Sequence, residues 1–222
     1  MNETWRFQFE KGEDVCYISH LDLMRCMERS FRRAGIIPAH SEGFNPHPKI
    51  SFGLPLPVGV VSRICYMDVE FEDAMVGDEM ICRLNKALPK GLSISYAVKT
   101  EDKKSVMSLV SRAQYRYRID PLVRDKEELA KEINDILAQT GIYIEKETKK
   151  SKKMVNLKDM IHLYHVQTEG DYVVVEVTCD AGSISNLNPM LFWQAICLYS
   201  DEVFELVSIE RTGLYFAEPN KA

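Results

Sequence analysis

The chain has 222 residues, 45% of them hydrophobic, and its 28 lysines and arginines are outnumbered by 33 aspartates and glutamates. A formal charge of −5 and a pI of about 5.6 exclude a protein that coats nucleic acid through bulk positive charge, so any polyanion binding must use a local patch. The length suits one large domain or two domains of roughly 100 residues each.

The location of the protein follows from what the sequence lacks. No apolar run approaches the roughly 20 residues that a membrane span needs, and the opening "MNETWRFQFEKG" has no apolar signal-peptide segment. The six cysteines lie far apart and form no CxxC pair, which favours reduced, mostly buried thiols over a zinc site. We therefore expect a cytoplasmic protein without membrane association, bound metal or other cofactor.

A strand and a helix open the chain. Residues 4–12 alternate large apolar and polar side chains, as a half-buried strand does, and end at Gly12. Ser19 is a predicted helix cap with Asp22 three residues later, and Gly35 marks the end of that helix. The helical spacing is carried by apolar residues, which are Leu21, Met24, Met27, Phe31 and Ala34.

The remaining pattern predicts two similar halves. After a loop rich in histidine and proline, the first half continues with two strands (49–56 and 63–72), a helix (77–91) and a strand (92–99). The second half repeats the order with strands at 113–120, 142–147, 172–180 and 204–216 and helices at 126–141 and 188–199. The predicted fold class is α+β: two tandem ferredoxin-like (β-α-β-β-α-β) units with antiparallel sheets, residues 1–100 and 101–222.

The first predicted helix carries a stripe of arginines. At about 100° per residue they fall within an arc of roughly 100°. The arginine stripe consists of Arg25, Arg29, Arg32 and Arg33. Because a guanidinium donates paired hydrogen bonds to phosphate, the stripe predicts contact with several phosphates. The alternative is a solvated helix face that Asp22 and Glu28 partly neutralise through ion pairs.

The loop "HSEGFNPHPKISFG" (40–53) is the second candidate site. Gly43 permits a turn, while Pro46 and Pro48 restrict the backbone, so the loop presents its side chains with little entropy left to lose. We predict that it folds back over the start of the first helix and forms one shallow pocket edged by the arginines. The substrate-binding residues expected there are His20, His40, Phe44, Asn45, His47 and Lys49.

A lysine-rich segment, "EKETKKSKK" (145–153), leaves two interpretations open. It could lie along a phosphate backbone, or it could be the solvated tip of a hairpin, which is the more common outcome for such a run.

The segments "SHLD", "GFNPHPK" and "PLPVG" together resemble the bacterial radical-SAM-linked protein family, long labelled a domain of unknown function. Its members occur beside, or fused to, cobalamin-binding radical S-adenosylmethionine enzymes, so the resemblance implies such an enzyme as partner. This chain lacks the CxxxCxxC motif that would ligate an iron–sulfur cluster, and it would supply substrate binding instead. The expected substrate is RNA, with transfer or ribosomal RNA as candidates, by analogy with other tandem ferredoxin-like proteins.

Two other classes of function remain. Tandem ferredoxin-like units with a histidine near the first helix are also similar to CRISPR-type endoribonucleases, in which His20 with His40 or His47 would act as acid and base without metal. The third class is a protein-interaction module without a substrate of its own. We assign no catalytic residue, because the accessory role is the preferred hypothesis.

Overall fold

The computed structural model describes residues 2–73, 76–101, 104–147, 152–200 and 203–217. The protein is mixed α+β, and the strand pairs described below are antiparallel. None of the helices in these ranges combines the length and the apolar character needed to cross a bilayer.

The chain divides into two compact units. The N-terminal unit runs to Val110 and also contains Phe216 and Ala217, and the second unit is Ser111–Tyr215. The division therefore falls after Val110 rather than after Thr100, where the sequence placed it. The reason is that Val106 is fully buried and its backbone N–H donates a hydrogen bond to Asp68 of the first unit, so the segment around Val106 packs with that unit.

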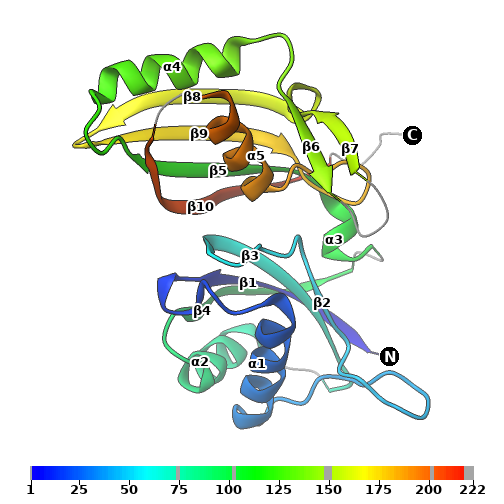
Figure 1. The fold of residues 1–222 in the computed structure, drawn as a ribbon. Helices are drawn as coiled ribbons and strands as arrows, with labels where there is room; N and C mark the ends of the chain where they lie inside the picture. Colours follow the sequence, from blue (N-terminus) through cyan, green and yellow to red (C-terminus); the bar gives the residue numbers. More distant parts are fainter. Residues whose placement is uncertain (1, 74–75, 102–103, 148–151, 201–202, 218–222) are drawn as a thin grey trace. The chain divides into compact units, whose positions relative to one another are not determined.

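The N-terminal unit places two helices on one face of a sheet (Figure 1). Its strands follow the order β4-β1-β3, with β2 paired to β3. The elements are β1 (Glu3–Lys11), a 3₁₀ turn (Glu13–Val15), α1 (His20–Arg33), β2 (Ile50–Phe52), β3 (Val60–Phe71), α2 (Gly77–Ala87), β4 (Leu92–Thr100) and the short α3 (Val106–Leu109).

Three aromatic rings join α1 to this sheet. Phe7 on β1 and Phe71 on β3 both lie beside Phe31 of α1, with ring centroids 5.9 and 6.1 Å from that of Phe31. All three side chains are at most 1% exposed. Edge-on and tilted ring contacts of this kind add to the free energy gained by burying apolar area. This cluster fixes α1 on the sheet and leaves its opposite face in solvent.

The ends of α1 lie where the sequence predicted them. The Ser19 side chain accepts a hydrogen bond from the Asp22 N–H at 3.2 Å, and Gly35 has a φ of 65°, a conformation that favours glycine. One predicted core position is wrong, however, since Leu21 is 62% exposed and Leu23 is buried in its place.

The second unit has a four-strand order and a separate hairpin. The order is β10-β5-β9-β8, while β6 and β7 form a two-stranded sheet. The elements are β5 (Val110–Asp120), α4 (Lys126–Ala138), β6 (Tyr143–Glu147), β7 (Lys152–Asn156), a 3₁₀ turn (Leu157–Met160), β8 (Ile161–Glu169), β9 (Tyr172–Asp180), α5 (Pro189–Tyr199) and β10 (Glu205–Phe216).

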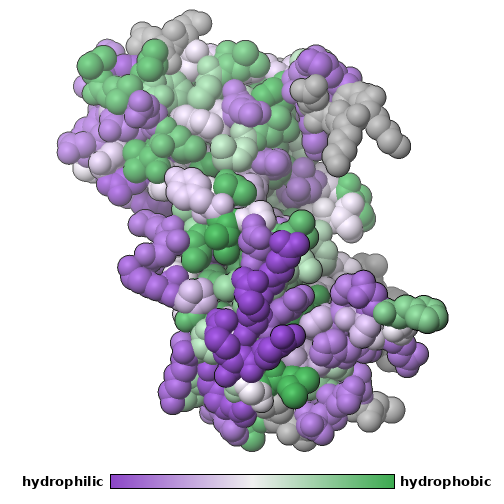
Figure 2. Space-filling model, turned by 60° about the horizontal axis from the view of Figure 1, so that its bottom comes forward, coloured by the Kyte–Doolittle hydropathy of each residue, from purple (hydrophilic) through white to green (hydrophobic). Residues whose placement is uncertain are grey.

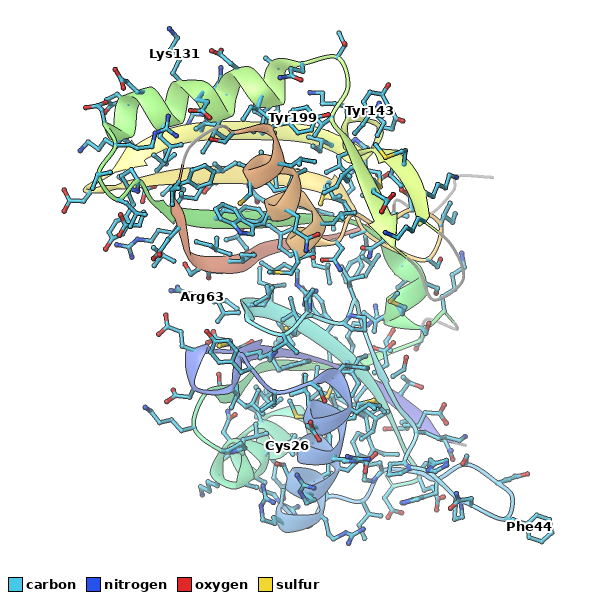
Figure 3. All side chains as sticks on the ribbon, in the orientation of Figure 1. Cys26, Phe44, Arg63, Lys131, Tyr143 and Tyr199 are labelled. Atoms are coloured by element: carbon cyan, nitrogen blue, oxygen red, sulfur yellow. The ribbon has the colours of Figure 1, made fainter. Side chains whose placement is uncertain are left out.

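Residues 143–147 form a strand, as predicted for 142–147, but this strand is not part of the main sheet of the unit. This segment pairs with β7, and β8 is the strand beside β9. The Tyr199 hydroxyl accepts a hydrogen bond from the Tyr143 N–H at 2.7 Å, which holds β6 against α5 (Figure 3). The described ends of the lysine-rich segment lie in this hairpin, and residues 148–151 are outside the described residues.

Candidate functional site

A polar cleft of about 470 Å³ lies in the N-terminal unit, next to the histidine- and proline-rich loop. Its floor comes from neighbouring strands of the sheet. In one cross-strand row, Thr4 of β1 is opposite Glu70 of β3, and the Glu70 N–H donates to the carbonyl of Lys49. In the next row, Asp68 lies between Arg6 of β1 and Ser51 of β2. The floor is thus set by sheet register, which makes its geometry rigid.

A buried ion pair anchors the second row. Arg6 donates from Nε and Nη2 to the two carboxylate oxygens of Asp68, at 2.8 and 3.0 Å. Asp68 Oδ2 also accepts the Val106 N–H at 2.8 Å. Their side chains are only 13% and 9% exposed, so this is a desolvated, bidentate pair. The pair therefore connects β1 and β3 with the start of α3.

A second ion pair, between Lys49 and Glu70, lies at the more open end of the floor. Lys49 Nζ is 2.8 Å from Glu70 Oε2, and both side chains are 37% exposed. The hydrogen bond from Lys49 lowers the pKa of the Glu70 carboxyl, and the same hydrogen bond raises the pKa of Lys49. Both groups therefore stay charged at neutral pH.

Two segments complete the cleft. Lys104 and Ser105 border it immediately before α3, held there by the bond between Val106 and Asp68. Ser41 and His47, at the neck of the loop, also line it. The cleft is therefore bordered by hydroxyl groups, an imidazole and an ammonium group.

The neck of the loop is closed by hydrogen bonds. The Ser41 N–H donates to the His47 carbonyl at 2.8 Å, and the His47 N–H donates to Ser41 Oγ at 3.0 Å. Beyond the neck, the loop extends into solvent, and Phe44 at its tip is fully exposed (Figure 3). Gly43 has a φ of 116°, which allows the reversal at this tip. The residues on either side of the loop bond to β3 rather than folding over α1, since the Ala39 N–H donates to the carbonyl of Glu70 and the Glu70 N–H donates to the carbonyl of Lys49.

The cleft includes some of the predicted site residues and omits others. His47 and Lys49 line it, whereas His20, His40, Phe44 and Asn45 do not, so the predicted pocket that would join the histidines with Asn45 does not form there. Most of the lining residues were not predicted from the sequence. The missed polar residues are Thr4, Ser41, Ser51, Asp68, Glu70, Lys104 and Ser105.

His20, at the start of α1, has a different environment. Its ring packs edge-on against Phe52 at 5.4 Å, and its Nδ1 is buried without a hydrogen-bond partner among the described residues. Burial, and secondarily the positive charge of the nearby Lys11, lower the pKa of His20. The imidazole is therefore neutral at physiological pH.

This lowered pKa predicts a pH dependence of stability. In the unfolded chain, His20 takes up a proton near its ordinary pKa of about 6.5, whereas in the folded chain it does so only at lower pH. The free energy of unfolding should fall as the pH drops through about 6.5 and level off below the folded-state pKa. Urea titrations of the wild-type chain and His20→Gln from about pH 7.5 to about pH 5 measure this, because glutamine does not titrate. Parallel pH profiles for the two proteins would contradict the assignment.

Only some arginines of the stripe on α1 make contacts within the protein. Arg33 Nη2 donates to the carbonyl of Ala87 at 2.6 Å and to Ser30 Oγ at 2.9 Å, joining α1 to the end of α2. Arg25 makes a loose, exposed ion pair with Asp22 at 3.4 Å.

Two arginines of the stripe remain available. Arg29 and Arg32 are exposed, and neither guanidinium group forms a hydrogen bond or ion pair with the described residues. Figure 2 shows a strongly hydrophilic band over the region where α1 lies. These side chains can therefore reach a ligand without breaking a contact described within the protein.

The fold and the site together define a mixed α+β protein of two units. The N-terminal unit carries a polar cleft and a basic helix, two of whose arginines form no side-chain hydrogen bond or ion pair with the described residues. Residues 5–189 match the family described as "Uncharacterized protein conserved in bacteria (DUF2344)". The match covers most of the sequence, so the chain belongs to this bacterial family. No curated protein matches it.

Two solved structures are similar to the chain. A chain of a Cbf5-Nop10-Gar1 complex matches 97% of this chain with a TM-score of 0.52 at 9% identity. The match covers 50% of that longer chain, so this protein spans about half its length, and the likeness concerns the fold alone. An unknown protein from Galdieria sulphuraria matches over 93% of this chain and 98% of its own, at 10% identity and a TM-score of 0.29.

Proposed function

We propose that the protein is an accessory subunit that binds RNA through its N-terminal unit for a cobalamin-binding radical S-adenosylmethionine enzyme. The observation that carries this proposal is the exposed pair Arg29 and Arg32, one helical turn apart on α1 and uncommitted among the described residues. Arg25 extends the basic surface along the same helix. Spaced guanidinium groups suit successive phosphates of a nucleic-acid backbone. The enzyme partner is supported by the resemblance of the segments "SHLD", "GFNPHPK" and "PLPVG" to the radical-SAM-linked protein family.

We also infer a ferredoxin-like arrangement in each unit. With the β6–β7 hairpin set aside, both units have the order β-α-β-β-α-β in their main elements. Both also place the strands in the order fourth, first, third, second across the sheet. The repeated order supports duplication of one motif, and proteins with such tandem units supply the analogy for an RNA substrate.

Charge reversal on α1 tests the RNA proposal. We expect Arg29→Glu with Arg32→Glu to weaken binding of bulk transfer RNA at least about tenfold at low salt. The slope of the logarithm of the affinity against the logarithm of the salt concentration should become shallower, as expected for the loss of about two phosphate contacts. The matched control is Arg118→Glu with Lys131→Glu, which changes the net charge equally at exposed positions of the second unit outside the lysine-rich segment. Filter binding over a salt series measures the RNA affinity of both variants. The affinity of the control should stay close to that of the wild-type chain.

Each other outcome points to a different function. Absence of RNA binding by the wild-type chain, with or without the radical enzyme, would favour a protein-interaction module. Equal losses in both variants would mean that only overall charge matters. Cleavage of the RNA by the chain alone, lost in His20→Gln, would replace accessory binding with endoribonuclease activity.

A further inference from the structure

Several polar groups that line the cleft form no hydrogen bond with the described residues. Among the described residues, the hydroxyls of Thr4, Ser51 and Ser105 form no hydrogen bond, and neither does the imidazole of His47. Glu70 accepts hydrogen bonds at Oε2 from Lys49 and Asn2, which leaves its Oε1 facing no described donor. A cleft of about 470 Å³ lies within the roughly 300–1,000 Å³ usual for small-ligand sites.

The charges of the cleft favour a ligand with one anionic group. In the floor, the Arg6–Asp68 and Lys49–Glu70 pairs cancel. Lys104 adds a positive charge that no ion pair with the described residues offsets, and His47 is a further donor for an anion. The free Oε1 of Glu70 requires the opposite chemistry, a hydrogen-bond donor such as a hydroxyl group.

We propose that this cleft binds a single ribonucleotide, with its phosphate at Lys104 and His47 and a ribose hydroxyl donating to Glu70. Phosphate, hydroxyl donors and a flat base are combined in one nucleotide, and Pro48 and Ile50 supply apolar lining for the base. The inference rests on the proposed function, because the nucleotide would be one residue of a bound RNA. Since side chains alternate along a strand, Arg6 and Glu70 point away from the sheet face on which Phe7 and Phe71 contact α1, so an RNA held by α1 would pass around the sheet edge to reach the cleft. It explains why the loop neck is closed by hydrogen bonds, since the neck positions His47.

Binding of mononucleotides to the full chain tests the site. Amide chemical shifts of Glu70 and Val106 should move on titration with AMP or UMP. The corresponding 2′-deoxynucleotides should bind at least about fivefold more weakly, because they lose a hydrogen bond to a charged group. Lys104→Ala with His47→Ala should raise the Kd for AMP about tenfold or more. Lys86→Ala, an exposed lysine on α2 that does not line the cleft, is the control and should leave the Kd unchanged.

Two further titrations define the ligand class. Inorganic phosphate and ribose 5-phosphate should bind more weakly than AMP, since they lack the base. Ribose 5-phosphate binding as tightly as AMP would overturn the assignment to a nucleotide in favour of a sugar phosphate. Competition of AMP with a short RNA oligomer for the same amide shifts is expected if the natural ligand is part of an RNA. Failure to compete would overturn that part of the inference.

The two proposals fail separately. If charge reversal on α1 abolishes RNA binding but AMP moves neither amide, the cleft inference is wrong and the RNA proposal stands. If AMP binds in the cleft and charge reversal on α1 leaves the RNA affinity unchanged, the cleft is supported as a nucleotide site and the α1 proposal is wrong.

Discussion

Replacement of Phe31 by alanine should lower the free energy of unfolding of the N-terminal unit by about 3–5 kcal/mol. Phe31 is completely buried and contacts the rings of Phe7 and Phe71. Removing it leaves a cavity between α1 and the sheet that these two rings cannot fill without leaving their own positions. Since α1 carries the arginine stripe, the same substitution should weaken RNA binding at temperatures where the unit begins to unfold.

Tryptophan fluorescence isolates this unit. The chain has two tryptophans, of which Trp5 lies in β1 and Trp193 in α5 of the second unit. In a Trp193→Phe background, urea unfolding followed by fluorescence reports on Trp5 alone. The matched control is Phe44→Ala, because Phe44 is fully exposed at the loop tip and should leave the midpoint unchanged. Similar midpoints for Phe31→Ala and Phe44→Ala would show that the aromatic cluster does not hold α1 on the sheet.

The helix α1 could be predicted because its signals are local. The Ser19 cap and the Gly35 stop act through atoms within one turn of the helix. The face that it buries was harder to predict, because Leu21 and Leu23 both fit a helical apolar pattern with Met27 and Phe31. Only packing against the sheet decides between them, and it buries Leu23.

Strand β8 was missed because its sequence does not alternate cleanly. The register with β9 shifts between Ile161 and Leu163, so His162 is an extra residue that reverses the inside–outside order. Leu163 consequently lies 69% exposed. A bulge of this kind removes the period of two on which strand prediction depends.

The cleft shows the same division between local and distant information. His47 and Lys49 were predicted because glycine and proline mark their loop in the sequence itself. Thr4, Glu70 and Lys104 come from three separate parts of the chain and meet only through sheet register and the Val106–Asp68 hydrogen bond. No spacing in the sequence encodes such a meeting, so the floor and one border of the cleft became visible only in the structure.

Asp68→Ala should destabilise the N-terminal unit by about 3–5 kcal/mol, because it removes one partner of a buried ion pair. The Arg6 guanidinium would lose its bidentate carboxylate in a setting where its side chain is 13% exposed. The Val106 N–H would lose its acceptor at the same time. Urea unfolding in the Trp193→Phe background measures the loss. Asp68→Asn should be less damaging, since the amide oxygen can still accept a hydrogen bond.

The control for Asp68→Ala is Asp14→Ala, which breaks an ion pair of the same unit in solvent. Asp14 bonds Lys90 at 2.9 Å, but their side chains are 48% and 86% exposed, so water replaces the lost contact and the midpoint should barely move.

Because Asp68 also holds the segment that carries Lys104, Asp68→Ala should abolish the AMP-induced shift of the Val106 amide even in urea-free buffer where the unit remains folded. An Asp68→Ala protein as stable as Asp14→Ala would show that the Arg6–Asp68 pair does not organise the cleft floor. If the Asp68→Ala protein is folded and still binds AMP with wild-type affinity, AMP binding does not depend on the Asp68 side chain.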